Sequence, residues 1–304
     1  MKANKTNKTP YHRQTELMLQ ILPFVMKYDC FALKGGSAIN FFLRDLPRLS
    51  IDIDLTYLPI QNRETTILNI SNSLKHIAEM VSQSFRDLKI IPGKSLNSDL
   101  WNGIIMQSDG ALVKIEPNLI IRGSVFPCET RKLTPTAEIT FEMSMMVKTL
   151  SLADIYGSKI CAALDRQHPR DLFDIKLLFE NEGLTEPIRK AFIVYLISHN
   201  RPIHELLAPN MIGIKHIFDN EFFGMTNTHV TFDELVTVRE QLVLKIKKGL
   251  TLEEKNFLLS LKRKDPIWHL LGIDGIEKLP SVQWKLINLN KMPNNKYQEA
   301  LNQL

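Results

Sequence analysis

The sequence predicts an α/β (α+β) protein, with a small mixed sheet flanked by helices in its N-terminal half and a helical C-terminal half. Short strand-like segments alternate with helical ones up to about residue 150, whereas only helical periodicity follows. The 304 residues are 44% hydrophobic and 23% charged, which is ordinary for a globular protein and excludes collagen-like and disordered classes. At roughly 100–200 residues per domain, we expect two domains, 1–150 and 151–304. No linker rich in Pro, Gly or Ser separates them, so close packing of the two is expected.

The first elements are predicted by apolar spacing. Residues 14–26 carry apolar side chains at helical intervals, and a short apolar strand follows at 31–33. A helical stretch at 38–43 and a loop lead to 50–55, where apolar and polar residues alternate strictly as in a half-buried strand. Residues 63–85 have the pattern of a long helix.

The remainder of the N-terminal half is expected to be strand. Residues 112–122 indicate two short strands broken by Pro117, because proline cannot donate a ladder hydrogen bond. Residues 139–150 are strand-like again.

Capping signals define the C-terminal helices. Ser151 with Asp154 three residues later resembles a capping box and starts a helix that runs to about Arg166. Pro169 suits the first turn of the next helix, for which Gly183 is a suitable stop. Two threonines are expected to cap later helices, Thr231 and Thr251.

Composition also sets expectations for location. No run of apolar residues approaches the roughly 20 that a spanning helix needs, and the basic N-terminus lacks the apolar core of a signal peptide. The three cysteines show neither a disulfide framework nor zinc-ligand spacing: Cys30, Cys128 and Cys161. We therefore expect a soluble cytoplasmic protein without membrane contact, and favour a monomer.

The positive charge is concentrated near the C-terminus. The net charge is +5, and residues 245–296 hold 11 Lys and Arg against 5 Asp and Glu. Such a region suits a polyanionic partner, with nucleic acid the first candidate. A solvated lysine-rich helical surface explains the same excess equally well.

The candidate phosphate-binding and metal-binding residues lie in the segment 34–55. A strand ends in Gly35 and Gly36, which let the backbone take positive φ and approach a ligand closely, and Ser37 then opens a helix. Free N–H groups and a hydroxyl at such a turn form a site suited to phosphates. Fourteen residues then separate Ser37 from Asp52, which forms Asp-Ile-Asp with Asp54.

The two aspartates are expected to form a metal site. On a strand their carboxylates share one face, about 6.5–7 Å apart. They repel each other unless a cation lies between them, and Mg²⁺ prefers one or two carboxylates together with substrate phosphate oxygens. A phosphate-binding turn beside such a metal site is typical of enzymes that catalyse phosphoryl or nucleotidyl transfer.

The whole segment resembles motif I of the DNA polymerase β nucleotidyltransferase superfamily. The longer pattern, Leu33 to Ala38 followed by Arg48, Ser50, Asp52 and Asp54, resembles the AbiEii-type nucleotidyltransferase toxins of abortive-infection, type IV toxin–antitoxin systems. Asp154 to Lys159 resembles the third motif of that family, and Arg170 to Asp174 resembles the fourth. The closing stretch, 280–301, is also similar, so the resemblance covers nearly the whole chain.

The resemblance implies specific roles. Asp52 and Asp54 would be catalytic and would hold Mg²⁺ or Mn²⁺. An NTP would be held by five residues: Gly35, Gly36, Ser37, Arg48 and Lys159. Lys159 would neutralise a phosphate, and Asp174 would orient Lys159 or act as a base toward the acceptor hydroxyl. Both would come from 151–304 and join residues of the nucleotidyltransferase domain, 1–150, in one active site between the lobes.

Two features depart from the family pattern. The gap from Ser37 to Asp52 is at the long end for motif I. The third carboxylate of the superfamily is not evident, and Glu116 on a predicted strand ranks below Lys159 and Asp174. Asp154 and Asp171 are explained by positions near helix N-termini, where carboxylates are favoured.

The expected activity is transfer of a nucleoside monophosphate from an NTP to an acceptor, with release of pyrophosphate. The resemblance implies a toxin with a cognate antitoxin, and an RNA acceptor, tRNA above all. A protein or small-molecule hydroxyl stays open as acceptor. The other classes of function are a non-catalytic nucleic-acid or partner-binding module of the same fold, and a DNA-binding regulator, for which no helix-turn-helix stands out.

Overall fold

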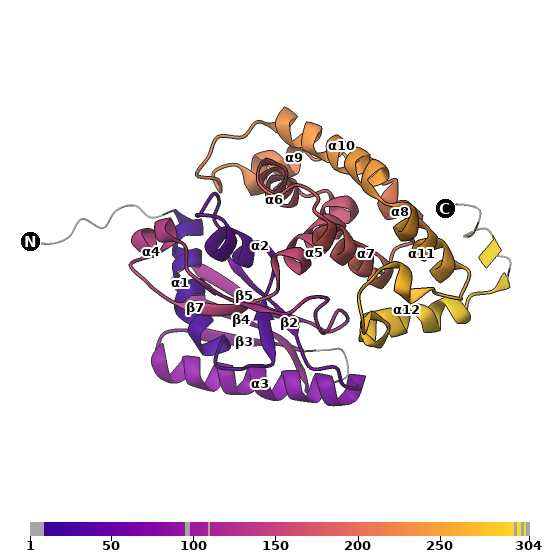
Figure 1. Ribbon diagram of the computed structural model, residues 1–304. Coiled ribbons are helices and arrows are strands. Elements are labelled where there is room, and N and C mark those ends of the chain that lie inside the picture. Colours follow the sequence, from indigo (N-terminus) through magenta and orange to yellow (C-terminus); the bar gives the residue numbers. More distant parts are fainter. Residues whose placement is uncertain (1–8, 95–97, 109, 295–296, 299–300, 302–304) are drawn as a thin grey trace, which may run out of the picture. The chain divides into compact units, whose positions relative to one another are not determined.

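The computed structural model describes residues 9–94, 98–108, 110–294, 297–298 and 301. Within these ranges the chain forms two compact units. Unit 1 comprises the described residues of 1–122, 128–150 and 224–228, and unit 2 comprises those of 123–127, 151–223 and 229–304. The mixed α/β class that the sequence predicts is confirmed (Figure 1).

Unit 1 is built on a seven-stranded mixed sheet of order β3-β4-β5-β2-β1-β7-β6. Strands β2 and β5 pair in parallel, as do β1 and β7, and the other neighbours are antiparallel. The strands are β1 Phe31–Leu33, β2 Asp52–Tyr57, β3 Lys89–Lys94, β4 Trp101–Ser108, β5 Ala111–Asn118, β6 Glu129–Lys132 and β7 Met146–Thr149.

Helices pack against this sheet. Helix α1 contacts β5, helix α3 contacts β4, and the two helices contact each other, so they cover the same face. The helices of unit 1 are α1 Pro10–Val25, α2 Gly35–Ala38, α3 Arg63–Ser84 and α4 Pro135–Phe141. Helix α2 begins at Gly35 with Lys34 as its N-cap, so Ser37 lies inside the helix and does not open it as the sequence predicts. The helix continues directly into a π-helical turn, Ile39–Leu43, where the sequence predicts an ordinary helix.

Two of the sequence predictions for unit 1 are wrong. Residues 112–122 contain one strand, because β5 continues through Pro117. The ladder with β4 ends at Ile115, so no hydrogen bond to β4 is lost at the proline. The stretch 139–150 is not one strand, since it begins in α4 and only Met146–Thr149 is β7. Pro135 starts α4, and Glu142 ends it in the left-handed conformation, with φ 53°.

Unit 2 is helical in its described part. Helices α5 and α7 form its centre, with α6 and α8 against α5, and α11 and α12 against α7. The helices are α5 Leu152–Arg166, α6 Pro169–Glu180, α7 Glu186–Ser198, α8 Ile203–Leu207, α9 Lys215–Ile217, α10 Phe232–Gly249, α11 Leu252–Lys262 and α12 Pro280–Asn290. Shorter turns are π-helical at Phe218–Phe222 and 3₁₀ at Trp268–Leu270 and Ile276–Lys278.

The predicted caps of these helices are confirmed. Ser151 accepts a hydrogen bond from the Asp154 backbone at the start of α5. Thr231 and Thr251 each form a complete capping box, with Glu234 and Glu254 respectively. These caps satisfy N–H groups that a helix end leaves without partners. Among the described residues, no helix is both long and apolar enough to cross a membrane.

Candidate active site

The glycine turn lies against the carboxylate strand. Gly35 has φ +71°, and a Cβ at this position would collide with Oδ2 of Asp54. Backbone pairing fixes this approach, because the Lys34 N–H donates to the Asp54 carbonyl at 3.0 Å. Glycine is therefore required at position 35 both by its conformation and by the space that the Asp54 side chain occupies.

Asp52 and Asp54 lie on the same face of β2, as the alternation predicts. Both are half-buried, while Ile53 between them is fully buried. Strand β5 runs parallel to β2, and its Glu116 is the register partner of Asp54. The carboxylates of Asp52, Asp54 and Glu116 thus belong to adjacent positions of one sheet.

The two aspartates fit a magnesium ion that keeps open positions for substrate. Within the described residues, no group of three or more His, Cys, Asp or Glu is arranged to hold a metal ion. A pair of hard carboxylate oxygens is nevertheless the protein donor set typical of Mg²⁺ sites that are completed by water and substrate phosphates. Asp52 and Asp54 would hold such an ion.

Ser37 stabilises the turn. Its side chain is buried, and its hydroxyl donates to the Asp52 carbonyl at 2.5 Å and lies 3.1 Å from Ser50 Oγ. The single hydrogen of the hydroxyl is thus directed to the backbone of β2. The serine ties the glycine turn to the strand that carries the aspartates.

Arg48 lies beneath the glycine turn. Only 2% of its surface is exposed, and a Cβ at Gly36 would lie 2.7 Å from its guanidinium Nη2. Nη1 donates to the Leu49 carbonyl at 2.9 Å. Arg48 therefore contributes positive charge behind the turn and is not a solvated loop residue.

A strand-like segment from far along the chain holds the Arg48 loop. In this segment, which comprises residues 224–228, Asn227 donates from its backbone to Pro47 O at 2.9 Å and from its side chain to Leu46 O at 2.7 Å. Leu49 donates to Met225 O at 2.8 Å. The long gap between Ser37 and Asp52 thus forms a loop that pairs with 224–228, and the sequence contains no local sign of this pairing.

Unit 2 brings Lys159 and Asp174 together in a buried ion cluster. Lys159 Nζ lies 3.0 Å from Asp174 Oδ2 and 3.0 Å from Asp171 Oδ1, and the three side chains are 6%, 0% and 1% exposed. Arg166 forms a two-pronged contact with Asp171, at 2.5 Å from Nε and 2.9 Å from Nη2. Two positive and two negative groups therefore balance within one cluster on α5 and α6.

The sequence predicts only a helix-terminal role for Asp171, but the structure places it in this ion cluster. It lies in the first turn of α6, where a carboxylate is favoured, but its carboxylate also binds Lys159 and Arg166. Burial alone would raise the pKa of Asp171, yet the charges and hydrogen bonds of Lys159 and Arg166 hold it well below its usual range. The cluster could have been predicted from the spacing of its charged residues along two consecutive helices, namely Lys159, Arg166, Asp171 and Asp174.

Asp154 has a structural role beyond its cap. Its carboxylate accepts hydrogen bonds from the backbones of Val125 and Phe126, each at 2.9 Å, and from Tyr195 Oη at 2.9 Å. Burial raises the pKa of this carboxyl, although these donors act in the opposite direction. Asp154 thereby attaches the segment 123–127 to unit 2.

Comparison with known proteins identifies the relationship. The family described as "Nucleotidyl transferase AbiEii toxin, Type IV TA system" matches residues 16–288. Among solved structures, the chain is similar in fold to MenT4, a nucleotidyltransferase toxin from Mycobacterium tuberculosis H37Rv. The TM-score is 0.61 at 13% identity, over 92% of this chain and 93% of that chain. No curated protein matches the sequence.

Proposed function

The chain belongs to the AbiEii family of nucleotidyltransferase toxins of type IV toxin–antitoxin systems, and from this premise we propose that it transfers NMP from an NTP to tRNA with Mg²⁺. The observation that carries the proposal is the pair Asp52 and Asp54 on one face of β2, with Gly35 packed against Asp54. In this reaction an acceptor hydroxyl attacks the α-phosphorus of the NTP, and pyrophosphate leaves.

The proposed roles in unit 1 follow from its contacts. Asp52 and Asp54 would hold the divalent cation, which when bound neutralises charge on the triphosphate. Gly35 and Gly36 let the backbone come close to phosphates, and the buried Arg48 adds positive charge behind them. Ser37 positions the turn, since its hydrogen is directed to the Asp52 carbonyl.

The roles proposed for unit 2 differ between its two residues. Lys159 supplies positive charge to a phosphate, and Asp174 orients Lys159. An orienting role for Asp174 is favoured over that of a base, because its carboxylate is fully buried and lies 3.0 Å from Lys159 Nζ. That these residues serve the same reaction as Asp52 and Asp54, with 1–150 and 151–304 as the two domains, is a proposal supported by the motif resemblance.

An RNA acceptor is supported by charge. Exposed lysines occur along the helices of the basic region, among them Lys245, Lys248, Lys278 and Lys291. Contacts from such side chains to phosphates dominate the affinity of proteins for nucleic acids. NTP and tRNA as substrates place the proposed reaction in the cytoplasm, and a monomeric state stays a prediction.

The test is a labelling experiment. Purified protein is incubated with Mg²⁺, bulk tRNA and each α-³²P-labelled NTP in turn, beside Asp52→Asn and the exposed control Asp87→Asn. We expect label on tRNA with at least one NTP, retained in Asp87→Asn and lost in Asp52→Asn or with EDTA.

The other outcomes identify the alternatives. Pyrophosphate release without label on tRNA would point to a protein or small-molecule acceptor. The third outcome is that neither labelled tRNA nor pyrophosphate forms, while the Asp52→Asn variant still inhibits growth. This outcome would refute catalysis and favour a binding module.

A further inference from the structure

A hollow lined by aliphatic and basic side chains lies among α8, α10 and α11 in unit 2. Its volume is about 370 Å³, and eight residues line it: His204, Leu207, Ala208, Lys247, Leu250, Lys255, Leu258 and Leu259. Five of them are aliphatic and three are bases, and none carries a carboxylate. Neither Lys247 nor Lys255 has an ion-pair partner in the described part of the chain.

His204 contributes a buried polar atom without a partner. Its Nδ1 is inaccessible to solvent and makes no hydrogen bond to any described residue. Burial lowers the pKa of His204, and the nearby charge of Lys262 lowers it further. A buried nitrogen that lacks a partner costs free energy unless a ligand or water satisfies it.

More positive charge lies beside the hollow. Lys285 donates to the carbonyls of His199, at 2.8 Å, and Arg201, at 3.4 Å, in the turn that leads into α8. Burial lowers the pKa of both Lys285 and Lys262, and the charge of Lys262 adds to the effect on Lys285. Bases from three helices therefore gather around α8.

The neighbouring carboxylates are engaged elsewhere. Glu205, next to His204, pairs with Arg201 at 3.1 Å. Glu254, next to Lys255, pairs with Arg189 at 2.7 Å and completes the cap of α11. The excess of positive charge at the hollow is consequently not neutralised by these two groups.

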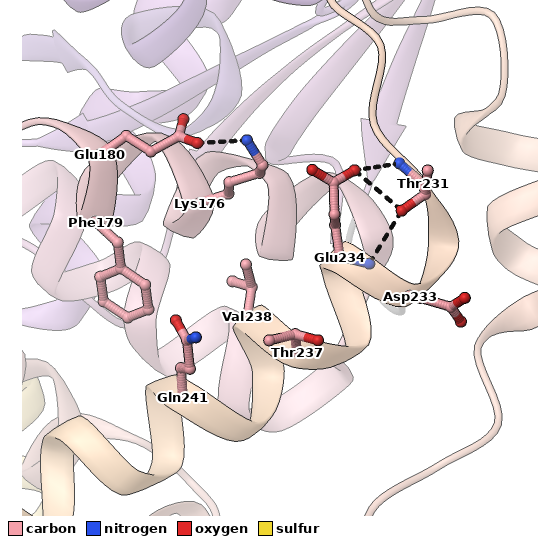
Figure 2. A pocket seen from close by; sticks show the side chains of 9 residues that line it. All are labelled: Lys176, Phe179, Glu180, Thr231, Asp233, Glu234, Thr237, Val238 and Gln241. Carbon is pink, nitrogen blue, oxygen red and sulfur yellow. Dashed lines mark hydrogen bonds and ion pairs between the residues drawn. The ribbon is translucent and has the colours of Figure 1, made fainter.

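A second hollow shows the contrast. This second hollow has a volume of about 380 Å³ and is lined by side chains of α6 and α10. In it, Glu180 pairs with Lys176 and Glu234 caps its own helix (Figure 2). Three of its four charged side chains thus satisfy each other or the backbone, and the fourth, the exposed Asp233, is a carboxylate, which the hollow at α8 lacks. The hollow at α8 differs in that its bases lack such partners.

We propose that the α8–α10–α11 hollow docks an acidic segment of a partner protein, which inserts an aliphatic side chain between the leucines and places carboxylates against Lys247 and Lys255. The leucines supply an apolar lining, and the exposed Lys247 and Lys255 supply positively charged donors. A single-stranded RNA is disfavoured, because His204, whose Nδ1 is buried, is the only ring among the described residues that line the hollow, and no Phe, Tyr, Trp or Arg lies there to stack a base.

The test uses the full chain and a defined probe. Random 12-residue peptides displayed on phage are selected on the immobilised protein, and the enriched peptides are then measured by fluorescence anisotropy. Charge is reversed at the hollow by Lys247→Glu with Lys255→Glu, and elsewhere by Lys278→Glu with Lys291→Glu. The control lysines are exposed and do not line the hollow, so both variants change the net charge equally.

We expect enrichment of sequences in which Leu, Ile or Val is flanked by Asp or Glu. Their affinity should fall at least tenfold in the hollow variant and less than twofold in the control variant. A third variant, Ala208→Trp, fills the hollow without changing charge and should also weaken binding.

Three results would overturn the proposal. One is enrichment without acidic and aliphatic residues, or no enrichment. Another is an equal loss of affinity in both charge variants, which would indicate only long-range attraction. The last is that the peptides do not bind, whereas a fluorescein-labelled 12-nucleotide oligo(U) binds and loses affinity only in the hollow variant. This result would assign the hollow to nucleic acid.

Discussion

The buried ion cluster of unit 2 allows the stability of this fold to be tested separately from its activity. In Lys159→Met, Asp174 loses a partner 3.0 Å away while it stays fully buried, and Asp171 keeps only Arg166 of its two cationic partners. Removing one partner of a buried ion pair costs about 3–5 kcal/mol, because it leaves a buried charge without compensation. At roughly 2–4 °C per kcal/mol for a unit of this size, the melting temperature should fall by about 6–20 °C.

The double variant Lys159→Met with Asp174→Asn supplies the control. It removes one positive and one negative charge, so that the pair of Arg166 and Asp171 is left in balance. Thermal unfolding of the full chain, followed by circular dichroism, should show the double variant melting well above the single one. Both variants should lack nucleotidyltransferase activity if Lys159 contacts the substrate.

A melting temperature of Lys159→Met within about 2 °C of the wild type would correspond to less than about 1 kcal/mol and would refute the expected cost of the unpaired charge. A double variant that melts no higher than the single variant would refute it as well. Recovery of activity in the double variant, together with its stability, would show that the loss in Lys159→Met came from unfolding and would refute a catalytic role for Lys159.

Three further predictions concern the turn, its supporting segment and the cluster. Gly35→Ala should lower the free energy of unfolding by about 1–2 kcal/mol from its φ of +71° alone, with more from the contact with Asp54, and urea unfolding measures this; an unchanged midpoint would contradict it. Asn227→Ala removes the side-chain hydrogen bond to Leu46 O and should lower the free energy of unfolding by about 1 kcal/mol. It should also raise KM for the NTP more than it lowers kcat, whereas an effect on kcat alone would argue against a positioning role. The lowered pKa of Asp171 stabilises the folded state at pH values above the unfolded pKa of about 3.9, and this stability is lost as the pH falls below that value toward the folded pKa. Melting temperatures between pH 6 and pH 2.5 should therefore fall more steeply for the wild type than for Asp171→Asn, and parallel curves would refute the assignment.

The secondary structure that depends on a few neighbouring residues could be predicted from the sequence. Period-2 alternation placed Asp52 and Asp54 on one face of a strand, and Ser or Thr followed by an acid placed the helix starts at Ser151, Thr231 and Thr251. The physical reason is that side-chain alternation and capping act over a few residues of the chain.

Local patterns failed where a stronger local signal or a pairing partner competed with them. Residues 139–150 contain a helix that starts at Pro135, and the apolar periodicity of the segment did not reveal it. Strands β3 and β4 were not predicted, although Asp109-Gly110 between two apolar runs is the sequence signal of a hairpin that would have indicated β4 and β5.

By itself, the sequence determined the fold class, the family motifs and the alternation that places Asp52 and Asp54 on one face of their strand. Only the tertiary structure decided which charges meet: Asp171 with Lys159 and Arg166, and Asn227 with the loop that carries Arg48. These contacts join residues that are 5 to 181 positions apart. Their geometry follows from how helices and loops pack, and packing depends on the whole set of buried side chains rather than on any short segment.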